Sequence, residues 1–243
     1  MGAASTSKPW KPSDLSPIDP FREPRPRACP KERGETLLYP IHTIRPLPVS
    51  SAPDTLAFFE VLEQRRSEQA MGPASIDLIG KLLWYGARVR AEYDSQYGHI
   101  QSRAAPSAGG LQCADIIVSR VDGIPGVHLY DPISHALCEV SPHVPERITQ
   151  YHAEIVEAFP ESTGCVITLL ADYEKADAKY DNAESLLLRD SGALMATLQL
   201  CATALGCAFC FSGNLGTTLN RAIVASPEAR IPVGSGIFGT RVS

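Results

Sequence analysis

Apolar residues follow helical periods in the first part of the folded region and strand-like periods after it. Asp54 is a helix-capping residue, and the apolar residues that follow it recur at helical spacing. A second helix is predicted to start near Ser75. The apolar faces consist of Leu56, Phe59 and Leu62 in the first helix, and of inward-facing Ile76, Ile79, Leu82 and Leu83 in the second.

Short apolar runs bounded by turn residues predict strands further along the chain. These runs are 115–121, 127–130, 136–140, 165–171, 207–211 and 231–240. The Asp-Pro turn at residues 131–135 joins the second run to the third. Helices are predicted at 145–158, 185–205 (ended by Gly206) and 217–224, and residues 88–110 are predicted to be a long polar loop. Strands and helices mix without strict alternation, which predicts an α+β fold with a mainly antiparallel central sheet flanked by helices.

The first 53 residues differ from the rest of the chain in composition. They hold eleven of the twenty prolines and have no sustained period. This composition is typical of an extended arm with polyproline character, although plain disorder is the alternative. We therefore divide the chain into an N-terminal arm, residues 1–53, and a folded domain, residues 54–243. The apolar stretch 37–47 is expected to pack against that domain.

Charge and cysteine content narrow the range of functions. The formal net charge is −5, which argues against nucleic acid as a partner. No apolar run reaches membrane-spanning length, so we expect no membrane partner. Seven cysteines are scattered through apolar segments, as in a cytoplasmic protein with reduced thiols. Cys207 and Cys210 form a CxxC pair, but no second ligand pair stands at metal-binding spacing, so no metal site is predicted.

The segment Arg103-Ala-Ala-Pro-Ser-Ala-Gly-Gly-Leu111 is the strongest candidate for a ligand site. Adjacent glycines let a backbone approach a flat ligand closely, because no Cβ stands in the way. Pro106 restricts the conformation at the entry to the pair Gly109 and Gly110. An ordinary tight loop before a strand is the alternative.

Three further motifs carry chemically useful groups. Arg65-Arg66-Ser67 offers two guanidinium groups and a hydroxyl to a phosphate, although a solvated basic helix end explains the motif better when it is taken alone. Lys179-Tyr180 precedes a helical motif, Arg189-Asp-Ser-Gly192. Arg241 follows a glycine-rich strand near the end of the sequence.

The order of these motifs resembles that of the SagB-type dehydrogenases. These are flavin enzymes of the nitroreductase superfamily, and they include the azoline dehydrogenases of thiazole- and oxazole-modified peptides. The resemblance covers residues 55–243. It rests on the Arg-Arg-Ser motif, Leu-Leu-Trp at 82–84, the Pro-Ser-Ala-Gly-Gly loop, the Tyr-Asp-Pro hairpin, Lys-Tyr, Arg-Asp-x-Gly-Ala-Leu and Ala-Thr-Ala-Leu-Gly.

The resemblance implies an interlocked homodimer with two FMN molecules at the subunit interface. Its implied partners are a small-molecule or peptide substrate and other biosynthetic enzymes. The implied cofactor-binding residues are Arg65, Arg66, Ser67 and Arg241 at the phosphate, and Pro106, Ser107, Ala108, Gly109, Gly110 and Gly213 at the isoalloxazine ring. The residues 107–110 are expected to reach the ring from the opposite subunit.

Lys179 and Tyr180 match the catalytic Lys-Tyr pair of the azoline dehydrogenases. Oxidation of an azoline to an azole removes a carbon-bound proton and sends a hydride to flavin N5, after which oxygen or another acceptor reoxidises the flavin. A tyrosine with its ordinary pKa of about 10 is a poor base at neutral pH, and an adjacent ammonium group favours its phenolate form. Two amphipathic residues at a helix boundary are the alternative.

This chain departs from the family pattern at three places. Gln69 stands where a second basic residue often follows Arg-x-Ser, Gln112-Cys-Ala-Asp115 replaces Tyr-Pro-x-Glu, and the polar stretch 91–101 is unusual. Two other functions therefore stay open. One is an NAD(P)H-dependent reductase of nitro or quinone compounds, which needs no Lys-Tyr pair. The other is a scaffold subunit of a peptide-modifying complex that binds little or no flavin.

Overall fold

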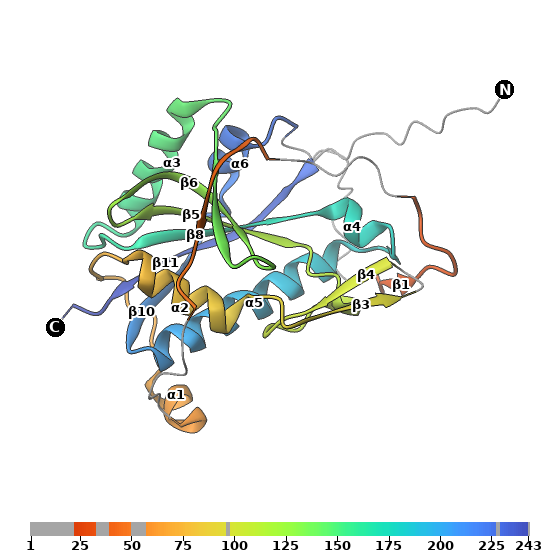
Figure 1. Cartoon of the computed structure of the whole chain (residues 1–243), viewed down its shortest axis with the longest axis horizontal. Coiled ribbons are helices and arrows are strands. Elements are labelled where there is room, and N and C mark those ends of the chain that lie inside the picture. Colours follow the sequence, from red (N-terminus) through yellow and green to blue (C-terminus); the bar gives the residue numbers. More distant parts are fainter. Residues whose placement is uncertain (1–21, 33–38, 50–56, 96–97, 227–228, 243) are drawn as a thin grey trace.

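A seven-stranded antiparallel sheet forms the centre of the protein (Figure 1). The structure, a computed structural model, describes residues 22–32, 39–49, 57–95, 98–226 and 229–242. The strand order is β10-β11-β8-β5-β6-β7-β2. The strands are β2 (Ile41–Pro46), β5 (Ala114–Val121), β6 (Ile124–Asp131), β7 (Ala136–Val140), β8 (Cys165–Ala171), β10 (Cys207–Ser212) and β11 (Ile231–Thr240). The predicted α+β architecture with an antiparallel sheet is confirmed.

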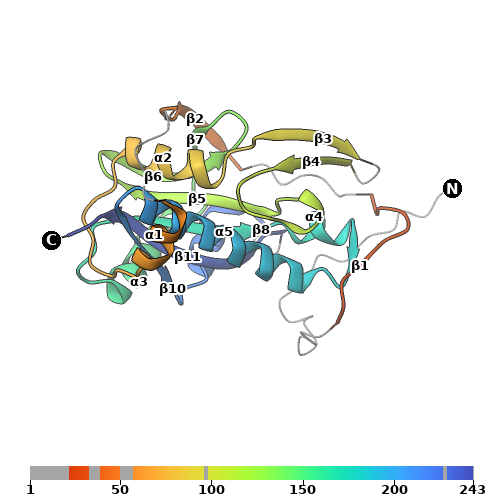
Figure 2. The ribbon, with the colours of Figure 1, turned by 90° about the horizontal axis from the view of Figure 1, so that it is seen from below.

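Helices cover both faces of this sheet (Figures 1 and 2). One face packs against α2 (Ile76–Gly86) and α5 (Glu184–Ala204), and the other against α3 (Pro145–Ala158) and α6 (Thr217–Ile223). Two short helices lie outside these layers, α1 (Phe58–Gln64) and α4 (Tyr173–Asp177). No helix of the described residues is long and apolar enough to cross a membrane.

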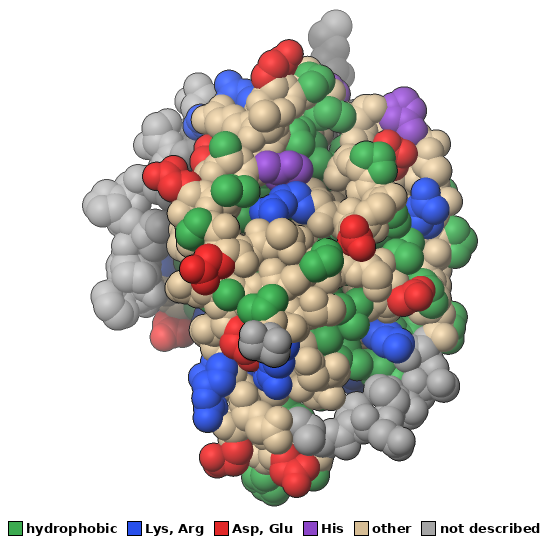
Figure 3. Space-filling model, turned by 90° about the vertical axis from the view of Figure 1, so that its left-hand side faces the viewer, with side chains coloured by type: hydrophobic (Ala, Val, Ile, Leu, Met, Phe, Trp, Pro, Cys, Tyr) green, Lys and Arg blue, Asp and Glu red, His purple; other side chains and the backbone are tan. Residues whose placement is uncertain are grey.

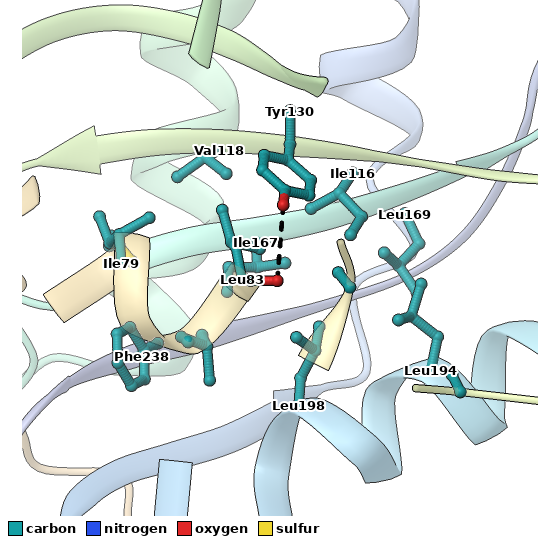
Figure 4. Close-up of a cluster of buried hydrophobic side chains, with 14 of the residues drawn as sticks. Ile79, Leu83, Ile116, Val118, Tyr130, Ile167, Leu169, Leu194, Leu198 and Phe238 are labelled. Atoms are coloured by element: carbon teal, nitrogen blue, oxygen red, sulfur yellow. Dashed lines mark hydrogen bonds between the residues drawn. The ribbon is translucent and has the colours of Figure 1, made fainter. Parts of the chain in front are cut away.

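The sequence of β8 follows from its position in the middle of the sheet. All seven residues of Cys165–Ala171 are buried, so the strand has no polar face and no alternation of apolar and polar residues. Successive side chains nevertheless point to opposite faces: Ile167 and Leu169 pack toward α2 and α5, and Val166 and Leu170 toward α3 and α6. Figure 4 shows the first of these two cores, in which Leu198 of α5 approaches the sheet.

The helices on the α2 and α5 face begin and end as the sequence indicates. The Ser75 side chain accepts a hydrogen bond from the backbone N–H of Leu78 and so caps α2. Helix α5 is followed by Gly206, which adopts a left-handed backbone conformation with φ of 70°. Both boundaries confirm the prediction to within one residue.

Helix α1 differs from its prediction. It begins at Phe58 with Ala57 as its N-cap, and the predicted cap Asp54 and Leu56 lie outside the described residues. Phe59 is 77% exposed and Leu62 is 43% exposed. The expected apolar face is therefore present but faces away from the core of this chain.

The predicted polar loop at 88–110 is wrong in its middle part. It contains a two-stranded hairpin formed by β3 (Ala91–Ser95) and β4 (Gly98–Ser102). Both faces of this hairpin are largely polar, so the sequence lacks the alternation that marks a half-buried strand. A short 3-10 turn, η2 (Ala108–Gly110), follows it. Figure 2 shows the hairpin extending from α2 toward the end of the molecule that carries α4.

The described parts of the N-terminal arm pack on their own chain. Strand β2 forms one edge of the central sheet beside β7, and β1 (Arg25–Pro26) pairs with β9 (Tyr180–Asp181). Tyr39 and Leu47 are buried at the two ends of β2. The Tyr39 hydroxyl donates to Oδ2 of Asp115 at 3.0 Å, which ties the arm to the start of β5.

We predict that the buried face of α3, which carries Tyr151 and Ile155, contributes far more to stability than its exposed face. Ile155 is fully buried beneath α3, whereas its neighbour Val156 is 45% exposed. Ile155→Ala should lower the free energy of unfolding by about 2–5 kcal/mol, because it leaves a cavity in the core. Val156→Ala should change it by no more than about 0.5 kcal/mol. Urea unfolding of both variants measures this; equal losses would contradict the described packing.

Candidate functional site

The predicted site residues fall into two groups that lie along α5, with Gly213 apart from both. The first group is the glycine loop, residues 106–110, together with Lys179 and Tyr180. The second is the arginine cluster, which we define as Arg65, Arg66, Ser67 and Arg241. Each group contacts a different part of α5.

Asp190 of α5 holds the glycine loop in place. Its Oδ2 accepts from the Ser107 hydroxyl at 2.7 Å and from the Ala108 backbone N–H at 2.9 Å. The Ser107 Oγ in turn accepts from the backbone N–H of Gln112 at 2.9 Å. A carboxylate bound by two donors fixes the loop more firmly than a neutral acceptor does. The Ser107 hydroxyl is thus engaged with Asp190 and Gln112.

The backbone amides of the loop are used unequally. Those of Ala108, Gly110, Leu111 and Gln112 donate to atoms of this chain. The Gly109 amide makes no such bond within the described parts of the protein, and Gly109 has a left-handed φ of 58°. The loop therefore offers one backbone amide donor, that of Gly109.

Lys179 and Tyr180 converge on Gly109. The Lys179 ammonium donates to the Gly109 carbonyl oxygen at 3.2 Å. A Cβ placed on Gly109 would overlap the Lys179 Nζ and lie 2.7 Å from the Tyr180 hydroxyl oxygen. The Lys179 Nζ lies 5.6 Å from the centre of the Tyr180 ring. The structure thus brings three predicted site residues together, although Gly109 and Tyr180 are far apart in the sequence.

The position of Lys179 changes its acidity. Lys179 is only 9% exposed, and burial lowers the pKa of its ammonium group below the usual value. A lysine with a lowered pKa exchanges its proton more readily than a solvated one. The pair therefore combines an amine and a phenol, both able to move protons, against a glycine backbone.

The arginine cluster forms where the chain leaves α1 and where β11 ends. The Arg241 Nε and the Glu68 carboxylate form an ion pair at 3.0 Å, which joins the two segments. Arg66 donates to the carbonyl oxygens of Glu63 and Arg65 at 2.6 and 2.8 Å, so its guanidinium caps the end of α1. Arg65, in contrast, makes no side-chain hydrogen bond or ion pair with the described residues. Arg65 and Arg241 are therefore better placed than Arg66 to bind an external anion.

Helix α5 separates the two groups within one chain. Asp190 binds the glycine loop, and the Gln199 side-chain amide donates to the Arg66 carbonyl oxygen at 3.3 Å. Nine residues of helix are two and a half turns, so these two residues project from opposite sides of α5 and lie about 14 Å apart along its axis. The structure does not bring the arginine cluster and the glycine loop of one chain together.

Gly213 lies in the loop between β10 and α6. A Cβ added there would meet no atom within 4 Å, so the backbone is accessible on that side. The neighbouring Asn214 fixes the loop: its carbonyl oxygen accepts from the Ser235 hydroxyl at 2.6 Å, and its amide donates to Glu154 at 2.9 Å. Gly213 shares no hydrogen bond with the glycine loop or the arginine cluster in the described part of the chain.

Asp115, which stands where the family pattern has Glu, takes part in an ion-pair network. Its carboxylate pairs with the Arg230 Nε at 2.8 Å, and Asp172 lies 3.4 Å from another nitrogen of the same guanidinium. Burial alone would lower the pKa of Arg230, but the two carboxylates outweigh it and raise that pKa. Asp115 thus serves the fold rather than a ligand. Among the described residues, no group of three His, Cys, Asp or Glu side chains is arranged to bind a metal ion.

Sequence reasoning assigned no role to Asp190. The residue belongs to the motif at 189–192, but nothing in its spacing connects it with Ser107, 83 positions earlier. A surface groove of about 400 Å³ also went unpredicted. Its lining residues, Trp84, Arg88, Val89, Arg90, Pro132, Ile133 and His135, include none of the predicted site residues.

We predict that an alanine at Gly109 is more harmful than one at another left-handed glycine. Gly123 has a φ of 72° and no neighbour within 4 Å of an added Cβ, so Gly123→Ala costs only backbone strain of about 1 kcal/mol. Gly109→Ala also collides with Lys179 and Tyr180 and should cost at least about 1 kcal/mol more. Urea unfolding compares the two; equal losses would show that Lys179 and Tyr180 do not lie against Gly109.

Comparisons with solved structures agree on one fold. A protein from Ralstonia eutropha JMP134, described as a nitroreductase, aligns with 87% of this chain and 98% of its own at a TM-score of 0.62 and 20% identity. A second, from Anabaena variabilis ATCC 29413, aligns with 76% of this chain and 38% of its own at a TM-score of 0.56 and 18% identity. A chain of the Escherichia coli microcin synthetase McbBCD complex, solved with truncated pro-MccB17 bound, aligns with 81% of this chain and 77% of its own at a TM-score of 0.55 and 17% identity.

The sequence comparison identifies the family. A search of the curated proteins gave no match. The profile of the nitroreductase family matches residues 62–225, which is more than half of the chain and includes the glycine loop, Lys179, Tyr180 and Gly213. The chain therefore belongs to the nitroreductase family, whose members are generally FMN-dependent oxidoreductases.

Proposed function

We propose that this protein is an FMN-dependent oxidoreductase of the SagB type that dehydrogenates a peptide-derived azoline to an azole. The observation that carries the proposal is the convergence of Lys179 and Tyr180 on Gly109. A pair of proton-exchanging side chains at a glycine loop suits a reaction in which a planar redox cofactor and a proton acceptor work on the same substrate.

The residues present fit FMN. The phosphate is a dianion, and Arg65 and Arg241 supply guanidinium groups of the kind that bind phosphate bidentately. A planar ring needs a wall without side chains, and Gly213 provides one, whereas the Cβ side of Gly109 faces Lys179 and Tyr180. The Gly109 amide is in addition a donor with no acceptor in the described part of this chain. The ring would lie against these glycines and the phosphate against the arginines.

A complete FMN site requires two chains in this proposal. The arginine cluster and the glycine loop lie on opposite sides of α5 in one chain, so a second copy supplies the loop that faces each arginine cluster. The apolar face of α1 supports a homodimer, because Phe58, Phe59 and Leu62 are exposed directly before Arg65. Such exposed apolar side chains are typical of interfaces. The lower end of Figure 3, where α1 lies, shows hydrophobic side chains among acidic ones.

The Lys179-Tyr180 pair handles the proton in the proposed reaction. Conversion of an azoline to an azole removes two hydrogens from adjacent ring atoms, one as a proton and one as a hydride. FMN, when bound, supplies the hydride acceptor at N5. Tyr180 takes the proton in this proposal, and the Lys179 Nζ lies 5.6 Å from the centre of its ring. The contact between Lys179 and the Gly109 carbonyl holds the pair against the wall of the ring site.

The type of substrate is supported by two observations. The Lys-Tyr pair matches that of the azoline dehydrogenases, and the contact of Lys179 with the Gly109 carbonyl oxygen supports a common role with the glycine loop. The fold is also that of a chain in a microcin synthetase complex that was solved with truncated pro-MccB17 bound. A nitro or quinone reductase would need the FMN site but not the proton acceptor, so the two functions differ in their dependence on Tyr180.

We predict that the arginine cluster distinguishes FMN from riboflavin. Arg241→Gln and Arg65→Gln should each weaken FMN binding about ten- to a hundredfold, because each removes a charged hydrogen bond to the phosphate. Riboflavin, which lacks the phosphate, should bind the variants and the wild type equally. Arg221→Gln, an exposed arginine on α6, is the control and should bind FMN normally. Fluorescence titration measures all four proteins; equal FMN binding would contradict the phosphate site.

We predict that Tyr180→Phe separates a dehydrogenase from a reductase. Loss of the proton acceptor should lower kcat for a thiazoline-containing peptide about 10²- to 10⁴-fold, while the bound flavin is unchanged. Reduction of a quinone with NAD(P)H should stay near normal in the same variant. Tyr93→Phe, on the exposed strand β3, is the matched control. Near-normal oxidation of the thiazoline by Tyr180→Phe would exclude the proposed role of Tyr180.

A further inference from the structure

Part of the N-terminal arm lies directly across the Lys179-Tyr180 segment. We name residues 22–32 the strap. Its strand β1 pairs with β9, with Pro26 opposite Tyr180 and Arg25 opposite Asp181. The backbone N–H of Arg27 donates to the Lys179 carbonyl oxygen at 2.9 Å, and that of Lys31 donates to the Ala178 carbonyl oxygen at 2.9 Å. Figures 1 and 2 both show β1 at the end of the molecule that carries α4.

The side chain of Arg27 ties both ends of this segment together. Its Nε donates to the Asp177 carbonyl oxygen at 2.8 Å, and its Nη2 to the Asp177 carboxylate at 2.9 Å and to the Tyr180 carbonyl oxygen at 3.4 Å. Its Nη1 forms an ion pair with Asp181. The side chain is only 17% exposed, so solvent screens these bonds weakly. One guanidinium thus spans the five residues that include the candidate catalytic pair.

The Lys179-Tyr180 segment has little other regular structure to hold it. Helix α4 has five residues and β9 has two, and elements this short open readily on their own. The strap contains Pro24, Pro26 and Pro30, and each proline ring fixes the backbone φ angle of its residue. The strap therefore loses less conformational entropy when it docks in an extended conformation. A pre-ordered strap therefore stabilises a segment that is weak by itself.

We propose that Arg27 is a positioning residue that holds Lys179 and Tyr180 against Gly109, so the proline-rich arm is part of the reaction site. The inference rests on the proposed function of that pair. Arg27 touches neither the reacting atoms nor the glycine loop; it acts through the backbone of residues 177–181. The strap belongs to the same chain as the pair it holds, so each site would depend on its own arm.

The test compares Arg27→Ala with Arg25→Ala and Arg27→Lys in the full-length, FMN-loaded protein. Arg25 is the matched control, because it lies in the same strand β1 and is exposed. Hydrogen–deuterium exchange of the amides at 177–182 reports on the segment, and steady-state kinetics with a thiazoline-containing peptide report on the reaction. The flavin absorbance of each variant reports whether FMN is retained.

In Arg27→Ala, exchange at 177–182 should rise at least about tenfold and kcat should fall at least about tenfold, while KM and FMN content stay the same. Arg27→Lys keeps one charged donor, so it should recover part of the protection from exchange and part of kcat. Arg25→Ala should match the wild type in both measurements. In a Tyr180→Phe background, Arg27→Ala should cause no further loss of kcat, because both changes act on the same step.

Two results would overturn the inference. Exchange in Arg27→Ala equal to that in Arg25→Ala would show that the strap does not hold the segment. Faster exchange with an unchanged kcat would show that holding the segment does not matter for the reaction. A wild-type protein that never oxidises the thiazoline contradicts the proposed function instead, and the exchange data then still decide whether Arg27 holds the pair.

Discussion

Helix α5 sets the geometry on which the rest of the site depends. It packs against the central sheet through Leu194 and Leu198, so its position and rotation are fixed by the core. Asp190 on one side then fixes the glycine loop, and Gln199 on the other side holds the end of the arginine cluster. A rigid helix with this arrangement keeps the two halves of the candidate FMN site apart in each chain, and our proposal of a second copy rests on that separation.

The chemical groups themselves sit on short and irregular segments around this rigid frame. Lys179 and Tyr180 lie between a five-residue helix and a two-residue strand, and the glycine loop is a single 3-10 turn. Such segments gain part of their order from specific polar contacts, in addition to buried side chains such as Ala176 and Ala178. Asp190 supplies those contacts for the loop, and Arg27 supplies them for the pair. Both contacts join residues that are far apart in sequence, so the site assembles only when the whole domain is folded.

Sequence patterns predicted the frame better than the site. The strand at β8 and the start of α2 near Ser75 reflect local rules, and the structure confirms both. The hairpin β3–β4 was missed because it is polar on both faces, and the sequence did not reveal that the apolar face of α1, with Phe59, points away from its own core. The roles of Asp190 and Arg27 depend on contacts across more than 80 positions, which spacing in one sequence does not reveal.

Native mass spectrometry of the purified protein tests the central claim most directly, because it measures the number of chains and the number of cofactors in one particle. A single chain has a mass of 26.2 kDa. The account predicts a particle of two chains that carries two FMN molecules, and it predicts that flavin is lost when the particle dissociates into single chains. A monomer that retains FMN, or a dimer that takes up none when FMN is added, would contradict it.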